Sequence, residues 1–402
     1  MGNVLLSIDM ITNEALRVLE NELVVTRTVN RQYDASFAKS GAKIGSTLRI
    51  RKPDRATVTD GPTIATQDEN QQWTTLTVSS QKNISMSFSS AERTMTLDNF
   101  SDLIIKPRMS QLAASIDYDV ANGVARYINQ VVGTPGTTPS TSQVLLAGMQ
   151  KLDEAAVPRS DRYCTVNPAA NAALVEGLKG LFNPGSTISD QFKSGLMGTG
   201  VLGIKEIAMS QSIGSLTTGT RTAGATLTTT VAAQGQTTLA ITTNGATDTI
   251  KAGDVFTLAN VYAVNPQTRV STGALFQFVA LADATAVGNA VTVTVPAIYW
   301  GPTQALATMD SVPTAAAAVT WVGGASLAYP QNLIYHKDAI TFATADLEFI
   351  GGGVESSRAM YNGMSIRVSN GGDIVNDRRI TRLDVLYGYG VIRPEMVCRL
   401  VG

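Results

Sequence analysis

Residues 101–131 read SDLIIKPRMSQLAASIDYDVANGVARYINQV, and their apolar positions recur at a helical period. The steps between these positions are 4, 3, 4, 4, 4, 4 and 3 residues, which average about 3.7 and match one face of an α-helix. We expect Ser101 to cap this helix, Pro107 to be tolerated in its first turn, and Gly133 and Pro135 to end it. At roughly 1.5 Å per residue the helix would be about 40 Å long, enough to support a sheet along its whole length. The apolar positions are Ile105, Met109, Leu112, Ile116, Val120, Val124, Ile128 and Val131.

The sequence before this helix predicts a shorter helix and a long hairpin. Apolar residues in segment 5–23 recur at threes and fours, which indicates an amphipathic helix. Alternation in residues 48–52 and again in residues 73–88 indicates two strands, with Lys52 on the same face as the apolar residues of the first. Because a polar stretch with the turn signal DGP at 60–62 separates them, we expect an extended hairpin that projects from the body.

Three regions follow the long helix. Residues 142–215 predict a mixed α/β region, in which QVLLAGMQKLDEAA and PAANAALVEGLKGLF are helical and RYCTVN is a strand. Residues 219–299 are rich in Thr, Ala and Val and nearly free of charge, which predicts an all-β module of five or six short strands. A six-stranded antiparallel barrel is the preferred shape for this module, and a sandwich remains open. The last sixty or so residues predict further strands separated by Gly-Gly and Asn-Gly turns.

Charge and cysteine content argue against several classes of protein. The chain has 31 basic and 32 acidic side chains, whereas a sequence-reading DNA-binding protein normally carries a basic surplus. Cys164 and Cys398 stand far apart in no metal-binding spacing, which argues against structural zinc and a disulfide framework and fits a reducing cytoplasm. No apolar run reaches the length of a membrane span, and the N-terminus lacks the order of a signal peptide. We therefore expect a protein that accumulates inside a cell and has no membrane partner.

No motif in the sequence predicts catalysis. His336 is the only histidine, and it lies in a strand-like run without a nucleophile motif such as GxSxG. We interpret it as a packing or hydrogen-bonding residue. The stretch GLMGTGVLG at 195–203 lacks the Lys-Ser/Thr of a phosphate loop, so a flexible loop is expected there. The sequence therefore predicts no enzyme, no cofactor and no metal site.

Three segments resemble the major capsid proteins of tailed bacteriophages. YHKDAITFATADL at 335–347 resembles the Phe/Tyr-His-Lys/Arg-Asp-Ala segment that precedes the final strands of those proteins. NFSDLIIKPRMSQLAASIDYDVANGV at 99–124 resembles their spine-helix region. GMSIRVSNGGDIVNDRRITRLDVLYGYGVIRPE at 363–395 is similar to the C-terminal strands of the coat proteins of short-tailed enterobacterial phages, which carry an inserted β-domain.

The resemblance implies an α+β fold, the major capsid fold of the Hong Kong phage type, with a barrel-like all-β insert. The implied parts are an N-terminal arm (1–42), an E-loop hairpin (43–90), the spine helix of the peripheral domain (91–135), an axial domain (136–218), the inserted β-domain (219–299), a return through the axial domain (300–345) and the C-terminal strands of the peripheral domain (346–402).

The implied function is that of a major capsid protein that self-assembles into an icosahedral shell around double-stranded DNA. The implied partners are further copies of this protein in hexamers and pentamers, a portal protein, and packaged DNA that is held without sequence specificity. Decoration proteins are also compatible with the resemblance. Because only about forty residues precede the hairpin, a separate scaffolding protein is implied, and Asp9 and Glu14 are expected to contact it. Assembly is expected in the host cytoplasm, with the product in the virion. The alternative is a β-rich phage tail or adhesin subunit, which the Thr/Val-rich insert suggests.

Overall fold

The computed structural model of the protein describes residues 8–32, 45–58, 61–62, 72–89, 101–177, 198–351, 354–373 and 378–402. The chain divides into two compact units. The first combines Met1–Ile50, Trp73–Val120 and Ile340–Ile392, and the second combines Arg51–Gln72, Ala121–Ala339 and Arg393–Gly402. Each unit therefore brings together segments that lie far apart in the sequence.

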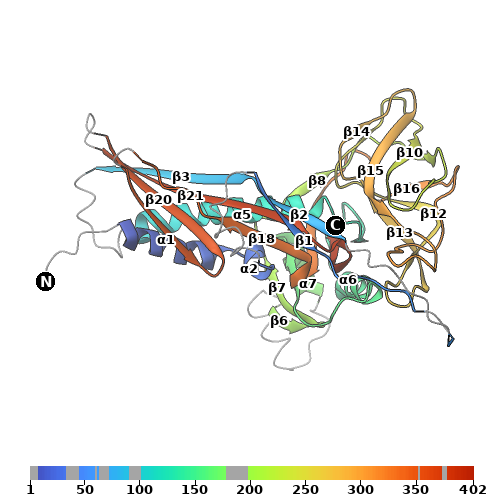
Figure 1. Ribbon diagram of the computed structural model, residues 1–402, viewed down its shortest axis with the longest axis horizontal. Helices are drawn as coiled ribbons and strands as arrows, with labels where there is room; N and C mark the ends of the chain where they lie inside the picture. The colour runs from blue at the N-terminus through green and yellow to red at the C-terminus, as the bar shows by residue number, and fades with distance from the viewer. Residues whose placement is uncertain are drawn as a thin grey trace. The chain divides into compact units, whose positions relative to one another are not determined.

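A five-stranded antiparallel sheet around one long strand, β21 (Arg378–Val391), organises the first unit (Figure 1). Along one edge β21 pairs with β20 (Met364–Asp373) and then with β18 (Ile340–Ala345). Along the other edge it pairs with β3 (Ser80–Ser89). A further strand, β19 (Glu355–Tyr361), pairs with β20. Because β21 has neighbours on both sides, its side chains Leu383, Val385 and Tyr387 are fully buried.

Two helical segments pack in the same unit. The apolar face of α1 (Ile8–Glu22) is buried, as the sequence pattern predicts, and α1 contacts β19 and β20. The short α2 (Val25–Thr28) is held by Asp117, whose carboxylate accepts the backbone N–H groups of Val24, Val25 and Thr26 at 2.7–3.2 Å. A buried carboxylate that accepts several N–H bonds satisfies the free donors at the start of a helix.

The long helix is shorter than predicted. A π-helical segment, η2 (Ser101–Ile105), leads into α5 (Lys106–Ala125), and the helix ends there. Ile128 and Val131 are buried as expected, but Val131 begins a strand, β4 (Val131–Gly133). The prediction failed because the spacing of buried residues continues past the end of the helix into the strand. Periodicity alone does not separate a helix from a short strand. Ser101, the expected cap, lies in η2, and its hydroxyl donates to Glu14 Oε1 at 2.5 Å.

The predicted hairpin begins with a paired base. β1 (Ser46–Arg51) pairs with β2 (Trp73–Val78), and the predicted strand 73–88 is divided at Ser79 into β2 and β3. The buried side chains of this base form a small core with β18 and β21, made of Ile50, Leu76, Val78, Ala343, Ala345, Leu386 and Ile392. Residues 59–60 and 63–71, which include most of the predicted hairpin tip, lie outside the described residues.

A mixed seven-stranded sheet forms the centre of the second unit. Its central strand, β17 (Ala328–His336), pairs with β22 (Val397–Val401) on one side and with β5 (Arg162–Val166) on the other. The sheet continues through β4 beyond β22 and through β7 and β6 beyond β5. The remaining bounds are β6 (Gly198–Val201), β7 (Ile204–Met209), β8 (Ser215–Thr217), α6 (Ser142–Glu154), α7 (Pro168–Gly177), η4 (Lys337–Ala339) and η5 (Pro394–Met396).

The charge-poor segment forms three small antiparallel sheets within described residues 198–351, and the two three-stranded ones are joined at both edges into a barrel-like arrangement, because Val319 N donates to Ala225 O at 2.9 Å and Leu281 N donates to Thr294 O at 2.8 Å. Their orders are β15-β10-β9, β11-β14 and β13-β12-β16. One core serves all three, and it includes Met309 and Val319, which lie beyond residue 299. The bounds are β9 (Thr226–Leu227), β10 (Gln236–Thr242), β11 (Thr249–Ile250), β12 (Val255–Val264), β13 (Ser271–Val279), β14 (Ala284–Thr285), β15 (Ala290–Ile298) and β16 (Val319–Trp321).

The chain enters and leaves this β-rich segment side by side. β8 pairs antiparallel with the start of β17. Beyond that pairing, Thr218 N donates to Leu327 O at 3.0 Å, and Ser326 N donates to Gly219 O at 2.9 Å. The segment enclosed by this neck therefore runs from residue 218 to residue 327, which is longer at its C-terminal end than the sequence pattern indicates.

Candidate functional site

His336 lies at the buried end of β17 and is 6% exposed. Its Nδ1 accepts a hydrogen bond from the backbone N–H of Asp338 at 3.2 Å. Burial lowers the pKa of the imidazole below its ordinary value of 6.5. Within the described residues, the ring has no hydrogen bond to a serine, threonine or cysteine side chain. This geometry suits a neutral packing residue and offers no nucleophile for the ring to activate.

The two acidic residues expected to contact a scaffolding protein both lie on α1 but do not face the same way. They are five positions apart, which is about 140° around a helix. Asp9 is exposed, and its Oδ1 accepts a hydrogen bond from Ser357 Oγ at 2.6 Å. Glu14 is bound by Arg17 Nη2 at 2.7 Å and by Ser101 Oγ at 2.5 Å. Asp9 is therefore the more accessible carboxylate.

The internal bonds of Glu14 also fix its charge. The hydrogen bond from Arg17 lowers the pKa of Glu14 from 4.5 to about 2, against the opposing effect of partial burial. Glu14 thus stays ionised under most conditions, while its oxygens are already occupied within the first unit.

Neither cysteine is placed for chemistry. Cys164 on β5 and Cys398 on β22 lie opposite Ile334 of β17, one on each side, and both are buried. Burial raises the pKa of both thiols, that of Cys398 to about 12. Within the described residues, no group of three or more His, Cys, Asp or Glu side chains is placed to hold a metal ion.

The glycine-rich stretch forms a hairpin where a flexible loop was expected. Its described part, from Gly198 to Gly203, comprises β6 and a turn into β7, with φ of 54° at Leu202 and 78° at Gly203. Two successive residues with positive φ are typical of the two-residue turns that join antiparallel strands. Among the described helices, none is long and apolar enough to cross a membrane.

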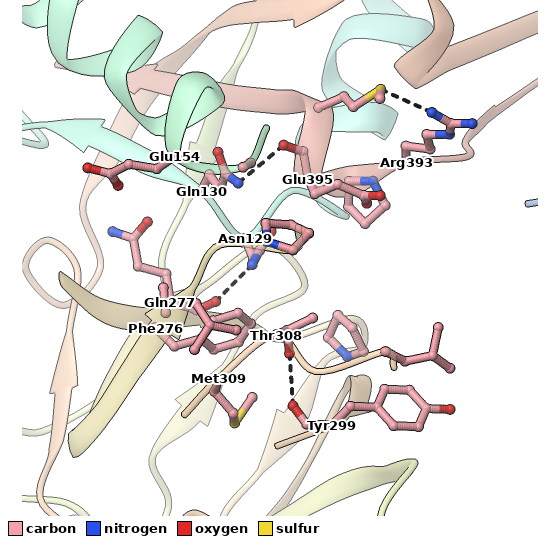
Figure 2. A pocket seen from close by; sticks show the side chains of 18 of the residues that line it. Asn129, Gln130, Glu154, Phe276, Gln277, Tyr299, Thr308, Met309, Arg393 and Glu395 are labelled. Carbon is pink, nitrogen blue, oxygen red and sulfur yellow. Dashed lines mark hydrogen bonds between the residues drawn. The ribbon is translucent and has the colours of Figure 1, made fainter. Parts of the chain in front are cut away.

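A cavity of about 450 Å³ lies within the second unit (Figure 2). One wall is apolar and comes from β13, the end of β15 and the residues after it: Leu275, Phe276, Phe278, Ile298, Tyr299 and Met309. The facing wall is polar and comes from the segments after β1 and α5, the end of α6 and η5. Figure 2 shows Glu154, Gln130, Glu395 and Arg393 on the opposite side of the cavity from Phe276 and Met309.

Hydrogen bonds hold the two walls at a fixed spacing. The Gln277 side chain pairs with both backbone groups of Val131, accepting from its N–H at 2.8 Å and donating to its carbonyl at 3.0 Å. Asn129 Nδ2 donates to Gln277 O at 3.1 Å, and Gln130 Nε2 donates to Glu395 O at 3.2 Å. These bonds join β13 to the chain after α5 and that chain to η5, so the cavity is already formed before anything enters it.

Six charged side chains line the cavity: Lys52, Arg55, Lys151, Arg393, Glu154 and Glu395. Arg55 pairs with Glu395 at 3.0 Å, and Lys151 lies 3.9 Å from Glu154. Lys52 and Arg393 are left without a carboxylate partner among the described residues. The lining therefore carries two more positive than negative charges.

The sequence did not reveal this cavity. Its lining comes from positions as far apart as Lys52 and Met396, and no spacing rule brings such residues together. One signal was present, since Lys52 continues the face of Leu48 and Ile50 in an alternating strand, where a lysine is unexpected. Arg393 carried no comparable signal.

Comparison with known proteins adds a family assignment. The model of the family "P22 coat protein - gene protein 5" matches residues 3–402. No curated protein matches the chain. Among solved structures, a chain of Mycobacterium phage Che8 has 12% identity and a TM-score of 0.46, with 94% of this chain and 90% of that chain covered. The mature capsid of bacteriophage PhiM1 has 12% identity and a TM-score of 0.42, with 88% and 81% covered.

The structural similarities are too distant to carry an argument, and the assignment rests on the family model. That model spans nearly the whole chain, and it favours the capsid prediction over a tail or adhesin subunit. The protein belongs to the P22 coat protein family and is a major capsid protein of a tailed bacteriophage.

Proposed function

We propose that this capsid protein builds an icosahedral shell of hexamers and pentamers around double-stranded DNA. The observation that carries the proposal is the family model over residues 3–402. Large apolar side chains exposed on the first unit support self-association, because a monomer gains by covering such surface. They are Phe349, Met360, Tyr361 and Ile380, with exposures of 47–63%.

The hairpin is the proposed link between neighbouring subunits. Its base, β1 and β2, packs against β18 and β21 within the subunit, so the residues beyond the base are the part proposed to reach a neighbour. Deleting residues 58–70 should leave the base and the folded subunit intact but prevent stable shells. Sedimentation velocity compares the deletion with the full chain. Shells from the deletion as abundant as those from the full chain would refute this role.

The further partners proposed are a separate scaffolding protein, a portal protein and DNA that is held without sequence specificity, and the family resemblance also admits decoration proteins. The net charge of −1 supports loose contact with DNA, because tight phosphate binding requires a basic surplus. Assembly in the host cytoplasm is consistent with two reduced, buried cysteines. The domain boundaries expected from the sequence belong to the same proposal, with the axial domain ending at residue 217, the insert running from 218 to 327 and the return segment beginning at 328.

The contact with the scaffolding protein is proposed to involve Asp9 and Glu14, with Asp9 as the main group. Asp9 is exposed, whereas Glu14 is bound internally by Arg17 and Ser101. Asp9→Asn should weaken binding of a basic scaffolding segment at low salt, and Glu14→Gln should weaken it less. Equal binding by wild type and both variants at low salt would exclude this contact.

A further inference from the structure

The cavity in the second unit has two unlike halves. Phe276 and Phe278 pack edge to face on its apolar side, with ring centroids 4.9 Å apart, and Met309 lies beside them in the lining. The other side bears Lys52 and Arg393, the two lining cations for which the described part of the chain supplies no paired carboxylate. A volume of about 450 Å³ falls within the range of roughly 300–1,000 Å³ that small-molecule sites occupy.

Both cations are only partly solvated. Burial lowers the pKa of Lys52, and the nearby guanidinium groups of Arg55 and Arg393 lower it further, although Glu395 opposes them. The side chain of Arg393 contacts Met396 Sδ at 3.8 Å, which supplies no negative charge. Partly buried cations without a partner are held at a cost in free energy, and an anion placed between them would remove that cost.

The existing carboxylates do not meet this need. Glu395 is engaged by Arg55 at 3.0 Å. Glu154 accepts from Gln150 Nε2 at 2.7 Å and lies 3.9 Å from Lys151. A ligand that satisfies the site must therefore bring its own negative charge, and it must also cover the apolar wall.

We propose that this cavity binds a small carboxylate with an apolar chain, of about ten carbon atoms, whose head lies at Lys52 and Arg393 and whose chain lies against Phe276 and Met309. A planar carboxylate matches the fork of a guanidinium group, and an aliphatic chain matches the apolar wall. This role is separate from shell formation, and it is tested on the unassembled full-length protein.

Isothermal titration calorimetry with decanoate as the probe measures the binding directly. We expect one site per chain, and a dissociation constant about tenfold or more weaker in the Lys52→Gln/Arg393→Gln double variant. Lys151→Gln is the matched control, because it removes a lining cation that already lies beside a carboxylate, and it should change the affinity less than about threefold. Decanol and acetate, which each lack one half of the ligand, should bind at least about tenfold more weakly than decanoate.

Three results would overturn the proposal. One is the absence of heat with decanoate up to about 1 mM. Another is equal affinity of decanoate for the wild type and the double variant, which would place the ligand elsewhere. The third is equal affinity for decanol and decanoate, which would show that the cations make no contribution. Lys52 and Arg393 are not fully buried, so the variants should fold, and circular dichroism checks this before each titration.

Discussion

Asp254→Asn should destabilise the β-rich insert far more than a similar change at the surface. Asp254 is 3% exposed, and its Oδ1 lies 2.6 Å from Arg221 Nη1. Its Oδ2 accepts the backbone N–H groups of Gly219 at 3.1 Å and Lys251 at 2.9 Å. Asparagine can keep one acceptor oxygen, but its amide group would then present N–H donors to the Arg221 guanidinium.

The substitution also leaves two buried cations without a compensating charge. Arg399 is fully buried, and it donates to Gly253 O at 3.0 Å and to Gln331 Oε1 at 3.3 Å. Burial lowers the pKa of Arg399 to about 10, so it remains charged at neutral pH. Among the described residues, its Nε and Nη2 have no hydrogen-bond partner. Asp254 is the nearby negative charge for both arginines, and removing one member of such a buried group costs about 3–5 kcal/mol.

Asp283→Asn is the matched control. Asp283 pairs with Lys251 at 3.1 Å and accepts the N–H of Ala252, but its side chain is 60% exposed. An exposed pair of this kind contributes about 0–1 kcal/mol. The two variants make the same chemical change, so the difference between them isolates burial.

Urea unfolding followed by tryptophan fluorescence measures the effect. Trp321 reports on the site, since the Arg221 guanidinium lies 5.3 Å from its ring centre, and Trp73→Phe removes the exposed tryptophan of β2. With a urea dependence of about 2 kcal/mol/M, Asp254→Asn should lower the midpoint for the insert by about 2 M. A shift no larger than that of Asp283→Asn would refute the assigned role of the buried charge group.

Three further predictions follow from burial. Cys164 and Cys398 should not react with a thiol reagent at pH 8 in the native protein, because both are buried and burial raises the pKa of each thiol, and both should react in denaturant. Rapid labelling of the native protein would contradict their buried positions beside β17. The free energy of unfolding should fall as the pH drops below about 6.5, because burial lowers the pKa of His336 in the folded protein. His336→Gln should make this pH dependence weaker, and the same pH dependence in the variant and the wild type would contradict the prediction. The fragment 217–327 should show a cooperative thermal transition, whereas 217–301 should not, because the shorter fragment lacks β16 and the core residues that follow residue 301. Equally cooperative thermal transitions of the two fragments would return the domain boundary to residue 299.

The sequence predicted local structure well where a repeating pattern coincided with one element. The face of α1 and the strand β15 are examples, because burial on one side alone produces their patterns. It failed at the end of α5, where burial continued at Ile128 and Val131 after the helix had stopped. A pattern of buried positions reports which side chains are buried, and it can continue unchanged where the backbone passes from a helix to a strand.

The parts that depend on tertiary contacts could not be predicted. Arg221, Asp254 and Arg399 come from three distant segments, and nothing in their local sequence distinguishes them from surface residues. The internal bonds of Glu14 to Arg17 and Ser101 likewise appear only in the fold. Family resemblance supplied the function, which no local pattern in the chain specified.

Negative-stain electron microscopy of the expressed full-length protein shows whether the subunits form a shell. We expect closed shells, or rings of five and six subunits that go on to form them. Tubes, isolated trimers or particles that never exceed the monomer at high concentration would contradict it.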